Sequence, residues 1–321
     1  MFLSLLALFA VADTNVVRDV QLGNGEILRT TSMGSGQPIL LIPGIFGGAF
    51  SFRRLTAPLA AQGYRCIVIE PLGFGSSSHP GTADYSFAAQ ADRIGHALDS
   101  LGASDALVIA QSTGAAIAYR LSYRRPDLVR GLLSIDGGPS EAASTPGLRH
   151  ALRFGGFLTK LFVGPGTIRK KVKHDLIENS ADTTWVTDSV VTEYTIGQAT
   201  DVDGAIDGLR NMAKSKEPES LRERIHEARS PVRLLRGTFP HPSSIKPEEI
   251  ALLRDQIPNF AMDSVLGAGQ YLGEEHPEAV ISALQALAIA APWRATPAHP
   301  DSAHAMSSSR DSSVLKVSPN D

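Results

Sequence analysis

The sequence predicts an α/β protein with a mostly parallel central sheet, helices on both faces and an inserted helical cap. Short apolar runs alternate with longer segments of helical periodicity through most of the 321-residue chain. This alternation is typical of parallel strands joined by right-handed helical crossovers. Between about residues 140 and 230 the pattern is helical without core strands, and then the alternation resumes. The interruption predicts the cap.

Each element is predicted from its own local pattern. Two alternating runs within 16–32, on either side of Gly23-Asn24-Gly25, predict a β-hairpin. The later strands are apolar runs bounded by turn residues, and the helices repeat apolar residues every three to four positions. The predicted strands are 38–42, 65–70, 105–110, 130–136, 231–237 and 260–266. The predicted helices are 51–62, 87–101, one from Gly114 onward, 246–256 and 277–291.

Composition limits the class of protein. Hydrophobic residues make up 43% of the chain and the net charge is −3, which fits a globular protein and argues against nucleic acid as the main partner. The single cysteine, Cys66, excludes an intramolecular disulfide and lies in an apolar run typical of a packed core. The nine histidines show no metal-ligand spacing, so we expect neither a metal nor a cofactor.

The first twelve residues are apolar and end in Ala10-Val11-Ala12, which resembles a signal-peptidase site. The stretch is shorter than the about 20 residues that span a bilayer, and it lacks the basic residues of a normal signal peptide. A cleaved signal, a membrane-surface anchor and an apolar extension on the fold all stay open, with export or membrane association slightly favoured over the cytoplasm. We divide the chain into an apolar segment 1–12, a core 13–139 and 230–292, a cap 140–229 and a disordered tail 293–321.

A serine lies at the apex of a predicted strand–turn–helix unit. The turn reads Ala110-Gln111-Ser112-Thr113-Gly114, with small residues two before and two after the serine, so the backbone can fold back sharply. This is the pattern of a nucleophile elbow, with Ala110 where a glycine is usual. The alternative interpretation is that Ser112 is only a small residue in a tight turn.

Four segments together resemble the α/β-hydrolase superfamily, in its capped esterase, haloperoxidase and epoxide-hydrolase-like branch. They are the turn at Ser112 and the segments 40–47, 71–77 and 267–277, and the resemblance runs from about residue 20 to 291. It implies that the Ser112 hydroxyl attacks a carbonyl while the backbone N–H groups of Ile45 and Thr113 stabilise the oxyanion. A serine at this position suits acyl transfer to esters and related carbonyl compounds rather than dehalogenation or epoxide opening.

The chain differs from that family at the two positions whose residues activate the serine. The family supplies a histidine after the last strand and a carboxylate after the preceding one, and these positions read Gln270 and Pro240. An amide has no basic nitrogen, so Gln270 can hydrogen-bond Ser112 but cannot take its proton. Loss of the base alone lowers turnover by about 10⁶ in a serine protease, so slow chemistry is expected.

Two other residues are candidate substitutes. His241 lies one residue after Pro240, the family's acid position. It is either the base that activates Ser112 or an ordinary histidine of an exposed loop. Asp136 ends the strand after the elbow helix, where some members of the family carry the acid of the catalytic triad. The equal alternative is a structural role, because aspartate is also favoured in a turn such as the one before Gly137 and Gly138. His79 and His276 are weaker candidates for the base.

Two classes of function stay open. The first is a serine hydrolase acting on a small apolar carbonyl substrate, and the second is an inactive relative that binds a small apolar ligand in the pocket between the cap and the sheet. The basic run 169–174 is interpreted as a solvated helix face, with weak contact to a membrane surface or an acidic substrate as the alternative. The sequence does not define the oligomeric state.

Overall fold

The computed structural model describes residues 14–142 and 165–293. The apolar segment 1–12 and almost all of the tail predicted for 293–321 lie outside these ranges, as does part of the predicted cap. Within the described ranges, no helix is long and apolar enough to cross a membrane.

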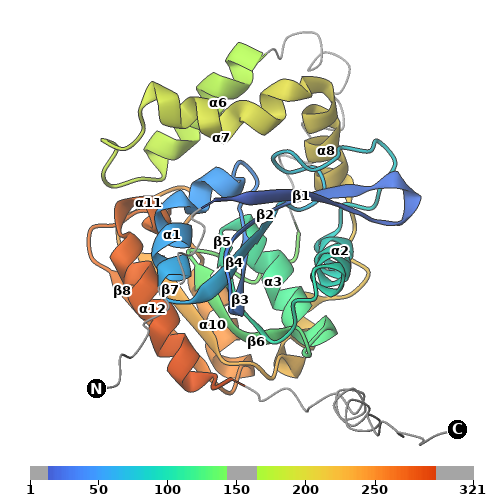
Figure 1. The fold of residues 1–321 in the computed structure, drawn as a ribbon. Helices are drawn as coiled ribbons and strands as arrows, with labels where there is room; N and C mark the ends of the chain where they lie inside the picture. The colour runs from blue at the N-terminus through green and yellow to red at the C-terminus, as the bar shows by residue number, and fades with distance from the viewer. Residues whose placement is uncertain (1–13, 143–164, 294–321) are drawn as a thin grey trace, which may run out of the picture.

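Eight strands form one sheet in the order β1-β2-β4-β3-β5-β6-β7-β8 (Figure 1). The pairs β1–β2 and β2–β4 are antiparallel, and the other five pairs are parallel. The α/β fold class predicted from the sequence is therefore confirmed. The strands are β1 (Val16–Gln21), β2 (Ile27–Gly34), β3 (Gln37–Ile42), β4 (Tyr64–Ile69), β5 (Ala106–Gln111), β6 (Val129–Ile135), β7 (Val232–Gly237) and β8 (Phe260–Val265).

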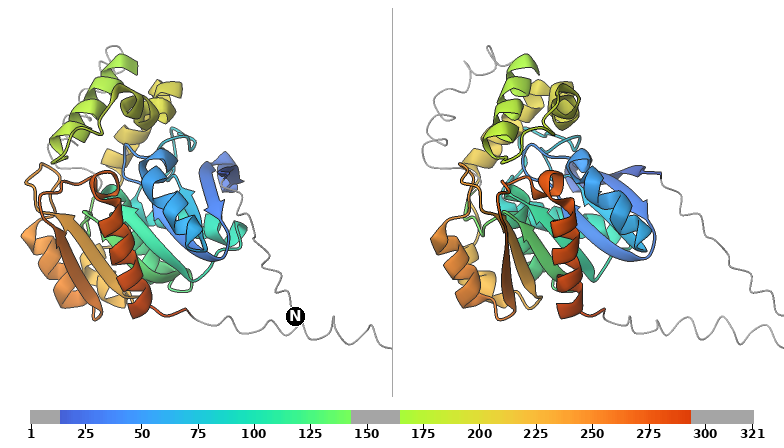
Figure 2. Two further views of the ribbon diagram at one scale, coloured as in Figure 1. Left: turned by 60° about the vertical axis from the view of Figure 1, so that its left-hand side comes forward. Right: turned by 90° about the vertical axis from the view of Figure 1, so that its left-hand side faces the viewer.

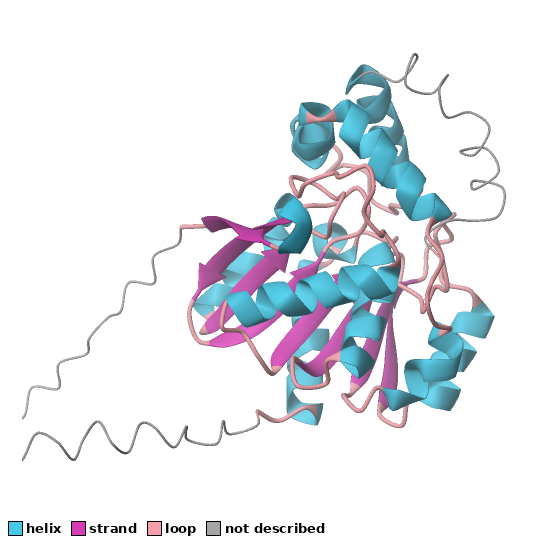
Figure 3. Cartoon of the chain, turned by 90° about the vertical axis from the view of Figure 1, so that its right-hand side faces the viewer, coloured by secondary structure: helices cyan, strands magenta, loops and turns pink. Residues whose placement is uncertain are grey.

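Helices cover both faces of the sheet (Figure 3). Successive strand residues point to opposite faces, so Leu40 and Ile42 join one buried cluster while Ile39 and Leu41 join the other. Apolar residues of α2, α3 and α10 pack in the first cluster, and those of α1 and α12 in the second. These helices are α1 (Arg53–Ala61), α2 (Phe87–Ser100), α3 (Thr113–Arg124), α10 (Pro247–Gln256) and α12 (Pro277–Ala290), and the short α11 (Leu272–Glu275) precedes α12.

A helical segment between β6 and β7 lies over the carboxyl ends of the strands (Figure 2). Its helices are α6 (Pro165–Glu178), α7 (Asp188–Thr200), α8 (Val202–Lys214) and α9 (Leu221–Arg224), and we call α6 to α8 the α6–α8 insertion. Its described part contains no strand, in agreement with the helical pattern. The boundaries 140–229 of a separate cap domain stay a prediction.

The basic run 169–174 lies on α6. Lys170, Lys171 and His174 are exposed, whereas Val172 between them is buried against α7. A helix with this pattern packs one stripe inward and leaves its charges in solvent. The solvated face predicted for this run agrees with the exposure of these side chains.

Gly114 marks the closest approach of α3 to β3. A Cβ added to this glycine would lie 2.6 Å from the carbonyl oxygens of Ile42 and Pro43, which are backbone atoms that cannot turn aside.

We expect Gly114→Ala to lower the free energy of unfolding by about 1–3 kcal/mol, because overpacking outweighs the preference of alanine for helices. Urea unfolding measures the change. Gly81→Ala, with no atom within 4 Å, is the control, expected within about 0.5 kcal/mol of the parent, and an equally small effect at Gly114 would contradict the prediction.

Candidate active site

Ser112 turns the chain from β5 into α3 in a left-handed conformation. Its φ is 50° and its ψ is −122°, which is unusual for a residue with a Cβ. The Ser112 N–H donates to the carbonyl oxygen of Ile135 at 3.0 Å, and its own carbonyl accepts from the Ala115 N–H at 3.0 Å. Gly137 leaves room for this turn, because a Cβ there would lie 2.6 Å from the Ser112 carbonyl oxygen. The predicted sharp turn is present, with the serine at its apex.

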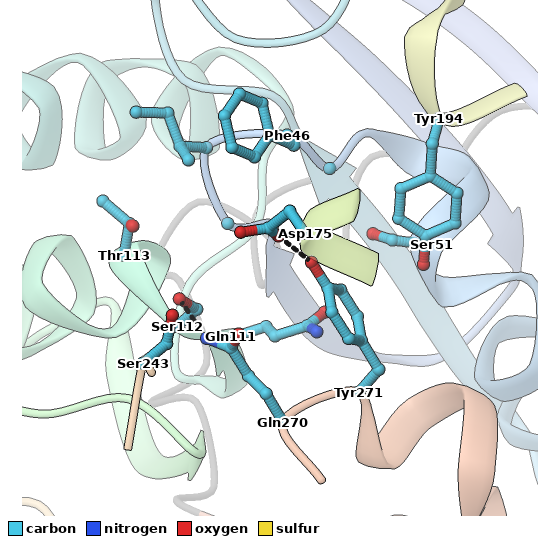
Figure 4. A pocket seen from close by; sticks show the side chains of 13 residues that line it. Phe46, Ser51, Gln111, Ser112, Thr113, Asp175, Tyr194, Ser243, Gln270 and Tyr271 are labelled. Atoms are coloured by element: carbon cyan, nitrogen blue, oxygen red, sulfur yellow. Dashed lines mark hydrogen bonds between the residues drawn. The ribbon is translucent and has the colours of Figure 1, made fainter. Parts of the chain in front are cut away.

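The Ser112 side chain borders a cavity of about 120 Å³ between the sheet and the α6–α8 insertion (Figure 4). Ile45 and Thr113, whose backbone N–H groups the sequence assigns to an oxyanion hole, line the same cavity. Thr113 is the first residue of α3, so its N–H has no acceptor within the helix. The loop after β8 closes another side with Gln270 and Tyr271.

Gln270 contacts the serine directly. Its side-chain nitrogen Nε2 donates a hydrogen bond to Ser112 Oγ at 2.6 Å, and the Gln270 side chain is buried. The Gln270 backbone N–H donates to the Asn179 carbonyl oxygen at 2.7 Å, which fixes the loop against the α6–α8 insertion. The residue at the family's histidine position thus lies where a base would lie, but it gives a hydrogen bond instead of accepting a proton.

Asp136 and His241 form a buried pair. The distance from His241 Nε2 to Asp136 Oδ2 is 2.7 Å, and the side chains are only 1% and 2% exposed. Asp136 lines a second cavity, of about 210 Å³, together with Ser112 and Thr113. His241 does not line either cavity beside Ser112, and its Nδ1 atom is buried without a hydrogen-bond partner among the described residues. The two residues that the sequence offers as separate candidates are therefore in contact, and Asp136 is the one that borders the cavity with Ser112.

The remaining sequence candidates lie elsewhere. Pro240 is exposed and does not border either cavity. His79 has a buried side chain 3.8 Å from Asp201 Oδ2, and burial lowers its pKa. His276 Nδ1 lies 3.3 Å from Glu278 Oε1 at the start of α12. The structure does not bring any of these residues to Ser112.

Asp175 and Tyr271 are site residues that the sequence reasoning missed. The Tyr271 hydroxyl donates to Asp175 Oδ2 at 2.7 Å at the border of the 120 Å³ cavity. Burial raises the pKa of the Asp175 carboxyl, and the hydrogen bond from Tyr271 opposes that shift. A signal was present in the sequence, because Asp175 lies three residues after Val172 and one before Leu176, on the buried stripe of α6.

Within residues 14–142 and 165–293, no group of three or more histidine, cysteine, aspartate or glutamate side chains is arranged to hold a metal ion.

Comparison with known proteins defines the family. The profile described as "alpha/beta hydrolase fold" matches residues 37–207, which is more than half of the chain. The chain belongs to the α/β-hydrolase family. Its curated relatives are named as hydrolases, among them lipases, haloalkane dehalogenases and an epoxide hydrolase.

Two of these relatives set the level of similarity. Lipase 3 of Moraxella sp. (strain TA144) is 33% identical over 133 residues, covering 40% of this chain and 42% of that protein. The haloalkane dehalogenase of Mycobacterium marinum (strain ATCC BAA-535 / M) is 30% identical over 142 residues, covering 42% of this chain and 48% of that protein. The chain therefore spans less than half the length of the curated relatives that it matches.

Solved structures share the fold over most of the chain. The epoxide hydrolase CorEH has a TM-score of 0.69 at 19% identity, covering 86% of this chain and 99% of that one. A thermophilic esterase from Thermogutta terrifontis has a TM-score of 0.69 at 21% identity, covering 87% of this chain and 99% of that one. These likenesses show the α/β-hydrolase fold and do not distinguish one reaction from another.

The contribution of the Asp136–His241 contact to the free energy of unfolding can be measured. Truncation of one partner leaves the polar atoms of the other buried without their partner, so His241→Ala is expected to lower the free energy of unfolding by about 1–3 kcal/mol. Asp136→Asn in the His241→Ala background should cost much less than it does alone. A double-mutant cycle by urea unfolding measures this coupling.

The exposed pair His174–Glu178 is the matched control, with side chains 69% and 47% exposed. Its coupling should stay below about 0.5 kcal/mol, as for other surface pairs on helices. Equal coupling in the two pairs would mean that the Asp136–His241 contact contributes no more than a surface ion pair.

Proposed function

We propose that the chain is a serine hydrolase of ester-type bonds, with Ser112 as the nucleophile and the backbone N–H groups of Ile45 and Thr113 as the oxyanion hole. The conformation of Ser112 carries this proposal. A residue held at positive φ costs about 1–3 kcal/mol and persists mainly at functional sites. The side chain so presented borders the cavity that Ile45 and Thr113 also line. The lipases among the relatives support the same reaction class.

In this proposal Ser112 Oγ attacks the substrate carbonyl, the leaving alcohol departs with a proton, and water then releases the acid from the acyl-enzyme. The serine proton needs an acceptor, which Gln270 does not provide. We assign that role to Asp136, because it borders the second cavity with Ser112, and we assign His241 the role of positioning Asp136. A carboxylate is a weaker base than histidine, so turnover is expected to be slow.

The second candidate function is binding without catalysis, and the Gln270–Ser112 hydrogen bond favours it. A donor 2.6 Å from Ser112 Oγ occupies the place of the missing base. A protein that had lost the reaction but kept the cavity would use it to hold a small ligand. The predicted apolar substrate or ligand, membrane-surface contact and export remain predictions for either function.

A fluorophosphonate probe distinguishes the two functions. An activated serine displaces fluoride from phosphorus and keeps the phosphonyl group, so we expect one adduct per chain on the peptide that contains Ser112. Intact and peptide mass spectrometry measure it. Ser112→Ala should abolish the adduct, while Ser264→Ala, a change at an exposed serine of β8, should leave it unchanged. A folded protein that takes up no probe would rule out the hydrolase and leave the binding function.

Gln270→His tests whether the absence of a basic side chain at position 270 limits the rate of hydrolysis. Histidine at this position places a basic nitrogen beside Ser112, and general base catalysis typically contributes 10²–10⁴-fold. We therefore expect hydrolysis of a p-nitrophenyl ester to accelerate by about 10²-fold or more. Gln270→Asn, which keeps an amide, is the control without a base. If both variants have the parent rate, the missing base does not limit the reaction.

A further inference from the structure

Among the described residues, the lining of the cavity beside Ser112 contains one carboxylate and no positively charged side chain. Asp175, from α6, contributes that carboxylate, and none of the residues that line the cavity is a lysine, arginine or histidine. The basic residues nearest to Asp175 in sequence, Lys171, Lys173 and His174, do not line the cavity. In the part of the cavity wall that the structure describes, an anionic substrate would therefore meet a negative charge with no counter-charge.

Asp175 keeps acceptor capacity after its contacts with protein are counted. One carboxylate oxygen, Oδ2, accepts from the Tyr271 hydroxyl at 2.7 Å. The other, Oδ1, has a 3.3 Å contact with Asn179 Nδ2, which also donates to the Asp175 carbonyl oxygen at 2.9 Å. Each carboxylate oxygen can accept two hydrogen bonds, so both oxygens can accept another donor.

Two tyrosine rings border the same space (Figure 4). Tyr194 and Tyr271 line the cavity, with ring centroids 6.3 Å apart and planes at 85°. Trp185 packs on both of them, with centroid distances of 6.1 Å and 5.5 Å. The face of an aromatic ring carries partial negative charge and attracts cations.

The hydroxyl groups of the two tyrosines both donate to carboxylates. Tyr194 donates its hydroxyl hydrogen to Glu274 at 2.8 Å, and Tyr271 donates its own to Asp175. Glu274 is neutralised by an ion pair with Arg53, which does not line the cavity. Arg53 also interacts with the Tyr194 hydroxyl, so the negative potential on this side of the cavity comes from the Tyr271 hydroxyl oxygen and the Asp175 carboxylate.

We propose that Asp175 is a specificity-determining residue, which selects a substrate or ligand carrying a small alkylammonium group. The carboxylate supplies the counter-charge, and Tyr194 and Tyr271 supply aromatic surface for the alkyl groups on nitrogen. The cavity of about 120 Å³ is smaller than the roughly 300–1,000 Å³ that takes drug-sized ligands, which suits a small head group. For the hydrolase this proposal rests on the proposed function, and it then defines the substrate class as ammonium-bearing esters.

The test compares two probes of the same shape, choline and its uncharged isostere 3,3-dimethylbutan-1-ol. Binding is measured by isothermal titration calorimetry with the full chain carrying Ser112→Ala, so the result does not depend on catalysis. We expect choline to bind at least about tenfold more tightly than the neutral alcohol, from its charge alone. Equal affinities, or no binding of choline, would overturn the proposal whatever the mutants do.

Asp175→Asn removes the charge and keeps the shape, so it should abolish the preference for choline. Glu178→Gln removes the same charge from an exposed position on the same helix and should leave the preference intact. Loss of the preference in both variants would mean that the overall charge of the helix, and not Asp175 in the cavity, selects the cation.

Ester hydrolysis by the parent chain separates this proposal from the proposed function. Hydrolysis of 3,3-dimethylbutyl acetate at the same kcat/KM as acetylcholine would support the hydrolase and overturn the role of Asp175. Preferential binding of choline without hydrolysis of either ester would support Asp175 and exclude the hydrolase.

Discussion

The site depends on the backbone of Ser112, which changes from strand to helix within a single residue. Its positive φ is held by a hydrogen bond to Ile135 and by two close approaches that only glycine permits, at Gly114 and Gly137. These contacts come from the ends of β3 and β6, the two neighbours of β5 in the sheet. The conformation of the turn therefore depends on contacts from the strands on either side of β5, and not on β5 and α3 alone.

Much of the fold was predictable because its signals are local. A strand buried on both faces is a short apolar run, as at 38–42, and the helices repeat every three to four residues, so both patterns can be recognised without knowledge of neighbours. The turn at Ser112 was predictable for the same reason, since its small residues are adjacent in sequence. The contact between Gln270 and Ser112 was expected from the resemblance to a family, which fixes where distant segments meet.

The remaining site features depend on contacts between distant segments. Asp136 and His241 follow the adjacent parallel strands β6 and β7, so their closeness follows from the strand order, which local sequence patterns do not specify. Asp175 follows a basic run on α6, and its charge suggests an exposed position. The spacing of Val172 and Leu176 indicates which stripe of α6 is buried, but that Asp175 beside this stripe borders the cavity depends on packing against α7 and Tyr271, which are distant in sequence.

The loop after β8 has a consequence for protein engineering. It is bonded to the segment that follows α6, through the Gln270 N–H to Asn179 and through Glu275, which accepts from the N–H groups of Ala181 and Asp182 at 3.0 and 3.1 Å. The α6–α8 insertion is therefore not an interchangeable module. Because the insertion contributes only backbone groups to these bonds, a segment grafted from a relative keeps them only if its backbone follows the same path beside Gln270 and Glu275. Grafting for new selectivity therefore has to match the backbone of the two segments to each other.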